Sequence, residues 1–129
     1  MKKKRNEKSR LILVIDDEDD VRNIFRMLLE SEGFRVREAC DGEEGIHLFK
    51  KDPADIVITD IIMPRKNGFE VIEELRRLNP EVKIIVISGS HVCDSGLVRN
   101  GKPLEVDAAL HKPIEIYDLL SEVKRILGE

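Results

Sequence analysis

The sequence has few aromatic residues, few cysteines and no long apolar segment. It contains no Trp, one Tyr and four Phe among 129 residues, which leaves little aromatic surface for stacking on bases, so we expect no direct nucleic-acid binding. Cys40 and Cys93 lack CxxC spacing, which favours isolated thiols in a reducing cytoplasm over a disulfide framework. No stretch approaches the roughly 20 apolar residues of a membrane span, so we expect a cytoplasmic protein without one.

Acidic and basic residues are distributed unevenly along the chain. The net charge is -4, but residues 1–10 hold six of the 22 basic residues and one of the 26 acidic ones, so this segment carries +5 and residues 11–129 carry -9. We interpret residues 1–10 as a basic, flexible tail and residues 11–129 as one domain. The apolar run after the tail has five residues, too few for an export signal, which needs roughly 7 to 15.

Short apolar runs alternate with segments of helical periodicity. The runs at 11–15, 55–59 and 83–87 are continuous and rich in branched residues, as is typical of strands buried on both faces. Residues 34–38 alternate between apolar and polar, and 108–110 is very short, so both are predicted to be edge strands.

Helical spacing of apolar residues fills the gaps between these strands, at 21–29, 42–51, 71–78 and 119–127. The alternation predicts an α/β fold of the flavodoxin-like, doubly wound type, with a five-stranded parallel sheet in the order 2-1-3-4-5 and five helices. The fourth helix would fall within residues 89–104, where glycines and a proline interrupt the pattern, so we expect it to be short or irregular.

Polar residues stand at the carboxyl ends of four predicted strands. Asp16 and Asp17 follow the first strand, Asp60 the third, Ser88 the fourth and Lys112 the fifth. In such a sheet the functional crevice lies beyond these strand ends. Three close carboxylates repel one another, and Mg²⁺, a hard cation that takes oxygen ligands, would balance their charge together with the lysine.

Plainer explanations exist for each of these residues taken singly. The acids at 16–20 could complement the dipole of the first helix, with Asp19 or Asp20 as its cap. Asp60 could begin a turn, Ser88 could cap the segment that follows it, and Lys112 could be a solvated surface residue. The convergence of all of them on one edge favours a common site.

Four motifs occur at these strand ends, and together they resemble the receiver domain of two-component response regulators. They are VIDDE, TDIIMPRKNG, VISGS and HKP, and the likeness covers about residues 10–128. The resemblance implies that Asp60 is the phosphoacceptor and that Mg²⁺ is bound by Asp16, Asp17, Asp60 and the backbone carbonyl of Ile62.

The same resemblance gives roles to the other residues of the site. Lys112 would pair with the phosphoryl oxygens and Ser88 would donate its hydroxyl to them. A cis peptide bond is expected between Lys112 and Pro113.

The resemblance also implies partners. The phosphoryl group would come from a sensor histidine kinase or a histidine phosphotransfer protein, and the phosphorylated form would contact a downstream protein that the sequence does not name. The protein would not be an enzyme in the ordinary sense, since it would catalyse only its own phosphotransfer and dephosphorylation. Because no output segment follows Glu129 in this sequence, we expect a stand-alone regulator that acts by protein–protein contact.

Two residues depart from the usual receiver pattern. Ala109 stands three residues before the lysine, where receivers usually have an aromatic residue, so we expect phosphorylation to move the segment after Ser88 instead. Ile62, two residues past Asp60, cannot orient an attacking water, so we expect slow hydrolysis of an aspartyl phosphate.

Other functions are compatible with parts of the sequence. The main alternative is a receiver-like binding module that is not phosphorylated. Residues 17–21 also fit the DxDxV pattern of haloacid dehalogenase-like phosphatases, and flavin-binding electron carriers share the predicted topology, although an acidic first loop does not suit a flavin phosphate. His91, Cys93 and Asp94 lack the number and spacing of ligands that a metal site requires.

Overall fold

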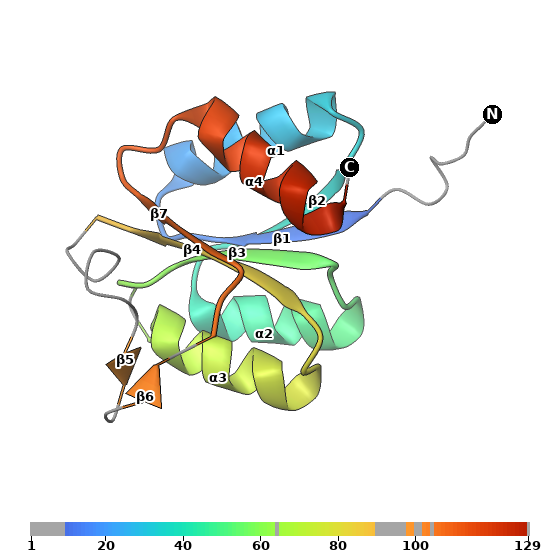
Figure 1. Ribbon diagram of the computed structural model, residues 1–129. Helices are drawn as coiled ribbons and strands as arrows, with labels where there is room; N and C mark the ends of the chain where they lie inside the picture. The colour runs from blue at the N-terminus through green and yellow to red at the C-terminus, as the bar shows by residue number, and fades with distance from the viewer. Residues whose placement is uncertain (1–9, 64, 90–97, 100–101, 104, 129) are drawn as a thin grey trace.

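Five parallel strands form one sheet in the computed structural model, in the order β2-β1-β3-β4-β7 (Figure 1). The structure describes residues 10–63, 65–89, 98–99, 102–103 and 105–128. The strands are β1 (Leu11–Ile15), β2 (Arg35–Ala39), β3 (Ile56–Asp60), β4 (Lys83–Ser88) and β7 (Ala108–His111). The predicted strand order is confirmed, and the two strands predicted at the edges, β2 and β7, lie there.

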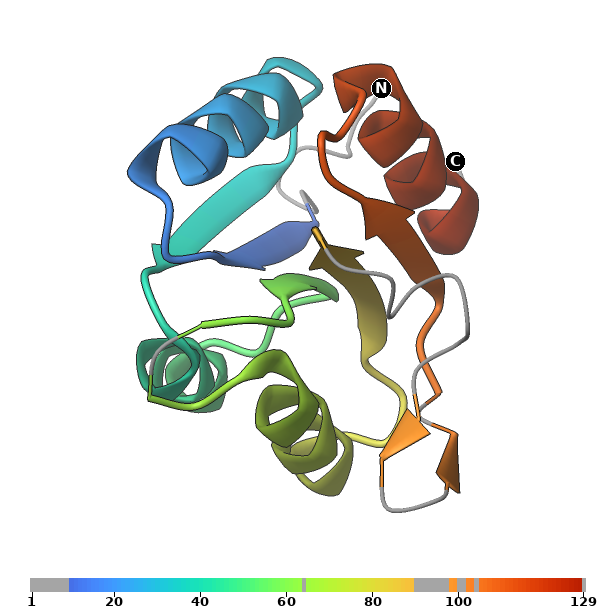
Figure 2. The same cartoon turned by 90° about the vertical axis from the view of Figure 1, so that its left-hand side faces the viewer.

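Helices cover both faces of this sheet. They are α1 (Asp19–Ser31), α2 (Gly42–Lys51), α3 (Gly68–Leu78) and α4 (Ile116–Leu127). Helices α1 and α4 lie on one face, and α2 and α3 lie on the other (Figures 1 and 2). The predicted doubly wound α/β fold is therefore confirmed, with four helices in the described part of the chain. None of them is long and apolar enough to cross a membrane.

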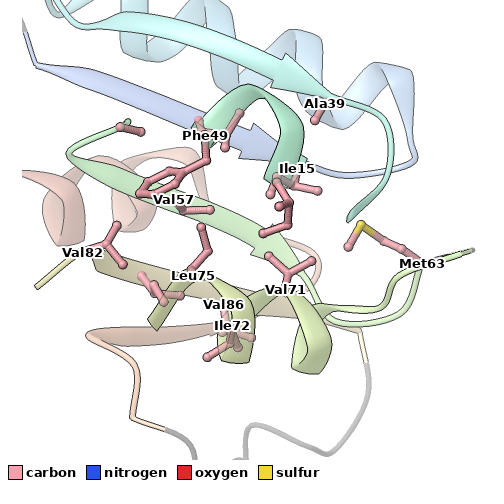
Figure 3. Close-up of a cluster of buried hydrophobic side chains, with 14 of the residues drawn as sticks. Ile15, Ala39, Phe49, Val57, Met63, Val71, Ile72, Leu75, Val82 and Val86 are labelled. Carbon is pink, nitrogen blue, oxygen red and sulfur yellow. The ribbon is translucent and has the colours of Figure 1, made fainter. Parts of the chain in front are cut away.

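Alternate residues of each central strand supply two separate hydrophobic cores. On the α2–α3 side, Leu13 and Ile15 of β1 pack with Val57 of β3, Phe49 of α2 and Leu75 of α3 (Figure 3). All of these side chains are almost fully buried, and burying each one stabilises the fold by roughly 1.5–3 kcal/mol.

The second core lies on the α1–α4 side of the sheet. Ile12 and Val14 of β1 pack there with Phe25 and Leu29 of α1 and with Leu119 of α4. Because every residue of β1 faces one core or the other, the strand reads in the sequence as an uninterrupted apolar run.

The helix starts use different local interactions. Asn67 and Glu70 form a capping box at α3, and Asp41 accepts a hydrogen bond from the NH of Glu44 at α2. The N-cap of α1 is Glu18, whose side chain makes no capping hydrogen bond, while Asp19 and Asp20 lie in the first turn. Neither Asp19 nor Asp20 is the cap, although both are placed to interact favourably with the helix dipole.

A fourth helix was predicted within residues 89–104. For residues 98–99 and 102–103 this prediction is wrong, because they form strands. Val98–Arg99 (β5) and Lys102–Pro103 (β6) pair as short antiparallel strands. The dipeptide Asn100-Gly101 between them is a strong sequence signal for a two-residue hairpin turn, and proline lacks the NH that a helix interior requires. Residues 90–97 and the tail at 1–9 lie outside the described residues, so the predictions for them stay predictions.

Candidate functional site

Asp16, Asp17 and Asp60 each bring a carboxylate oxygen to within 4.8 Å of the others. Asp16 and Asp17 directly follow β1, and Asp60 is the last residue of β3, which pairs with β1. Asp16 and Asp60 are only 1% and 5% exposed, whereas Asp17 is exposed to solvent. The predicted convergence of these three residues is thus present, because neighbouring parallel strands end at the same edge of a sheet.

Lys112 reaches this cluster from the end of β7. Its Nζ lies 3.0 Å from Oδ2 of Asp60, 3.4 Å from Oδ2 of Asp16 and 2.7 Å from Oε1 of Glu18. Burial disfavours the charged ammonium, but hydrogen bonds to Glu18 and Asp60 and the surrounding negative charge outweigh it, so the pKa of Lys112 is raised. The lysine is therefore a cation at neutral pH.

The backbone around Lys112 is held by the neighbouring strand. Its NH donates to the carbonyl of Ser88 at 2.9 Å, and the peptide bond to Pro113 is cis, as predicted. Lys112 and the last residue of β4 are therefore fixed relative to each other.

Asp16 has the most constrained carboxylate of the cluster. Its Oδ1 accepts a hydrogen bond from the NH of Glu18 at 2.8 Å, whereas its buried Oδ2 accepts none among the described residues. Burial, assisted by the negative charge of Asp60, raises the pKa of Asp16. A buried carboxylate oxygen without a hydrogen bond, next to two further carboxylates, fits a bound hard cation such as Mg²⁺.

Ser88 and Ile62 lie beside this cluster. Ser88 is the fully buried last residue of β4, and β4 pairs with β3 so that Asp60 stands opposite Ile87. The NH of Ile62 donates to Oδ1 of Asp60 at 3.4 Å, and the Ile62 side chain is 65% exposed. The hydroxyl of Ser88 as a phosphoryl ligand and the carbonyl of Ile62 as a metal ligand stay predictions.

Ala109 lies on β7 opposite Val86 of β4, and its small side chain is exposed. A methyl group is far smaller than an aromatic ring and reaches fewer neighbouring side chains. The position that usually carries the aromatic residue of receivers is therefore occupied by a side chain too small to act in the same way.

Glu18 makes the shortest of the three carboxylate contacts with Lys112, and sequence reasoning gave it no role. Its position within the acidic run 16–20 was visible, but the run gives no indication of which acids turn towards the lysine. The sequence predicted that Mg²⁺ and Lys112 balance the charge of three carboxylates. Glu18 adds one negative charge that this prediction did not include.

Gly68, the last residue of the TDIIMPRKNG motif, lies at the start of α3, and its role in the site was not indicated by the sequence. Its NH donates to the carbonyl of Ile61 at 2.8 Å. A Cβ atom at this position would lie 2.5 Å from the carbonyl oxygen of Asp60 and 2.7 Å from the Cα of Ile61. The helix start therefore packs directly on the backbone that carries Asp60, and only glycine permits this approach.

Arg22 supports the acidic loop from α1. Its guanidinium donates to the carbonyl of Asp16 at 2.6 Å, forms an ion pair with Asp19 and lies 3.4 Å from Glu38 of β2. It thereby joins the loop that bears the first two carboxylates to both the helix and the edge strand. The spacing of Arg22 from Asp16 was visible in the sequence, but the contact with a backbone carbonyl was not.

Replacing Arg22 with Gln should weaken Mg²⁺ binding about two- to tenfold, since the loop that presents Asp16 and Asp17 loses its clamp. Isothermal titration of the metal-free protein with MgCl₂ measures this. Arg26→Gln is the matched control, because Arg26 pairs with Glu38 and Glu30 but makes no hydrogen bond or ion pair with the loop in the described part of the chain. Equal affinities for the two variants would contradict this role for Arg22.

The strand order and the acidic cluster at the strand ends are those of the flavodoxin-like class of doubly wound proteins. Within this class, the chain belongs to the response regulator receiver domain family, whose sequence model matches residues 12–124. This confirms the family that the four motifs predicted. Neither a haloacid dehalogenase-like phosphatase nor a flavin-binding electron carrier is supported.

Similar proteins include regulators and a kinase. The chain is 33% identical over 116 residues to the transcriptional regulatory protein CpxR of Klebsiella pneumoniae, a match that covers 90% of this chain and 48% of CpxR. It is 34% identical over 124 residues to the sensor kinase CckA of Brucella abortus, covering 92% of this chain and 13% of CckA. The chain thus spans about half of the first relative and a small part of the second.

Solved structures agree with this assignment. A response regulator receiver domain protein from Clostridium thermocellum superposes with a TM-score of 0.80 at 28% identity. The match covers 92% of this chain and 94% of that one. The likeness extends over nearly the whole receiver fold.

Proposed function

We propose that this receiver domain accepts a phosphoryl group on Asp60 from a histidine kinase or a histidine phosphotransfer protein, in a Mg²⁺-dependent reaction. The phosphorylated form then acts in the cytoplasm by contact with a protein target. The observation that carries the proposal is the surroundings of Asp60: a nearly buried carboxylate within 4.8 Å of two others and 3.0 Å from an ammonium.

The proposed phosphoryl transfer requires the protein to form only one covalent bond. A carboxylate oxygen of Asp60 forms a bond to phosphorus while the phosphorus–nitrogen bond of the donor phosphohistidine breaks, and the departing imidazole keeps the bonding electrons and takes up a proton. Such a transfer depends mainly on alignment and on neutralising charge. Asp60 is held in place by Lys112 at one oxygen and by the NH of Ile62 at the other.

The other residues of the site divide the remaining tasks. Asp16, Asp17, Asp60 and the carbonyl of Ile62 would hold Mg²⁺, which supplies positive charge for the phosphoryl oxygens. Lys112 pairs with those oxygens as a point charge and Ser88 donates its hydroxyl to them. Asp60 gains negative charge on phosphorylation, and this change biases the equilibrium between inactive and active conformations.

Replacing Asp60 with Asn should reduce phosphorylation to background, at least about 100-fold, because an amide oxygen is a poor nucleophile and contributes no charge to a metal. The measurement is covalent labelling by acetyl phosphate followed by intact-protein mass spectrometry, with Mg²⁺ and with EDTA. Asp118→Asn, which alters an exposed carboxylate on α4, should label like the wild type. Mg²⁺-independent labelling, or labelling that survives Asp60→Asn, would refute the proposal.

The alternative is a receiver-like module that binds partners without being phosphorylated. The same experiment distinguishes the two, since such a module would remain unlabelled in the wild type while binding its target. The complete set of acidic and basic residues around Asp60 favours phosphorylation.

A further inference from the structure

Glu18 is an acidic residue of the 16–20 run that the proposed function leaves without a task. Asp16 and Asp17 belong to the carboxylate cluster, and Asp19 and Asp20 lie in the first turn of α1. Glu18 occupies the N-cap of that helix, a position at which Asp, Asn, Ser or Thr is preferred, and its side chain does not cap. The side chain is engaged with Lys112 instead.

Glu18 shares the ammonium of Lys112 with Asp16 and Asp60. The Nζ–Oε1 distance to Glu18 is 2.7 Å, shorter than the 3.0 Å to Asp60 and the 3.4 Å to Asp16. The lysine side chain is 22% exposed and that of Glu18 is 58% exposed. Glu18 thus reaches the ammonium from the solvent side, whereas Asp16 and Asp60 reach it from the buried side.

Glu18 makes the net charge of the site more negative. Among the described residues, four carboxylates surround or adjoin one ammonium here, so a divalent ion still leaves a net charge of -1. A phosphoryl group adds further negative charge. An ammonium has three N–H donors, and Glu18 makes the shortest contact with it, so a phosphoryl oxygen that pairs with Lys112 competes with Glu18 for a donor.

We propose that Glu18 is a positioning residue that occupies Lys112 in the unphosphorylated site and competes with the phosphoryl group for its ammonium. This inference rests on the proposed function of Asp60 and Lys112. Glu18 holds the lysine in place before the reaction and lowers the affinity of the site for a phosphoryl group. Its presence therefore sets how readily the protein responds to a phosphodonor.

The test uses Glu18→Gln, which keeps the size of the side chain and removes its charge. Beryllofluoride, a mimic of a phosphoryl group on a carboxylate, is titrated in Mg²⁺ and followed by backbone amide NMR shifts. We expect Glu18→Gln to bind it about two- to fivefold more tightly than the wild type, the range that partly exposed ion pairs give. Asp20→Asn is the matched control, since it removes the same charge nearby from an exposed residue outside the cluster.

A second readout needs no phosphoryl mimic. In the metal-free protein, Lys112 of Glu18→Gln should react faster with an amine-acylating reagent, measured by peptide mass spectrometry, because its solvent-side partner is weakened. Thermal unfolding of the same samples shows whether the fold is retained. Equal changes in Glu18→Gln and Asp20→Asn, or weaker beryllofluoride binding by Glu18→Gln, would overturn the inference.

The outcomes separate this inference from the proposed function. If the wild type neither binds beryllofluoride nor becomes labelled on Asp60, the proposed function fails. If the wild type does both and Glu18→Gln behaves identically to it in affinity and in lysine reactivity, only the role of Glu18 fails.

Discussion

Replacing Gly68 with Ala should destabilise the protein by roughly 2–4 kcal/mol, because the added methyl group has no room beside the backbone of β3. The added Cβ would lie 2.5 Å from the carbonyl oxygen of Asp60 and 2.7 Å from the Cα of Ile61. Both are backbone atoms, so relief requires α3 to move away from the end of β3. Such a shift would also displace Asp60 and weaken its phosphorylation.

Urea denaturation measures the change in the free energy of unfolding. Gly89→Ala is the matched control at the same edge of the sheet, because among the described residues its Cβ would meet side-chain atoms of Lys112 alone, at 3.9 and 4.0 Å. It should change stability by less than about 0.5 kcal/mol. If the two variants were equally stable, the close approach of α3 to β3 would not constrain the site.

Replacing Asp16 with Asn should stabilise the metal-free protein at neutral pH while severely weakening its Mg²⁺ binding. The raised pKa of Asp16, caused first by burial and then by the charge of Asp60, means that folding disfavours its ionised form. Asparagine is close in shape and uncharged, and its amide oxygen can still accept the hydrogen bond from Glu18. Coulomb repulsion between unit charges about 5 Å apart suggests a gain of roughly 1–3 kcal/mol.

The pH dependence of this gain follows from the direction of the pKa shift. Between the ordinary pKa of an Asp and the raised value in the folded protein, the folded state binds more protons than the unfolded state, so stability falls as pH rises. Below the ordinary value both states are protonated and the cost is absent. The variant should therefore match the wild type in acid and exceed it at neutral pH.

Thermal unfolding at several pH values, with EDTA and with Mg²⁺, measures both effects. Mg²⁺ should stabilise the wild type, since it binds the folded state, and should have little effect on Asp16→Asn. Asp20→Asn should respond to Mg²⁺ like the wild type. An Asp16→Asn protein that is less stable than the wild type and still binds Mg²⁺ would contradict the assignment of Asp16 to the metal site.

The fold was predictable because its main determinants are periodic in the sequence. The runs at 11–15 and 84–87 are apolar throughout, since residues on both sides of each strand face a core. The position of the acidic cluster was predictable from the topology, because neighbouring strands of a parallel sheet end at the same edge. The convergence of Asp16, Asp17 and Asp60 follows from strand order alone.

The remaining features depend on side-chain conformations and on close packing, neither of which produces a periodic pattern in the sequence. Glu18 could have turned to the helix or to the solvent, and its contact with Lys112 joins residues 94 positions apart. The approach of Gly68 to Asp60 depends on how the loop between β3 and α3 folds. The antiparallel pair of β5 and β6 did have a local sequence signal, the dipeptide Asn100-Gly101 that separates the two strands, whereas the alternation of strands and helices predicted a helix in this segment.

The hydrogen bond from the NH of Lys112 to the carbonyl of Ser88 links two residues that come from different strands. If the end of β4 shifts towards the carboxylate cluster, this hydrogen bond favours a movement of the Lys112 backbone in the same direction. A hydroxyl and an ammonium would then advance or retreat together rather than one after the other.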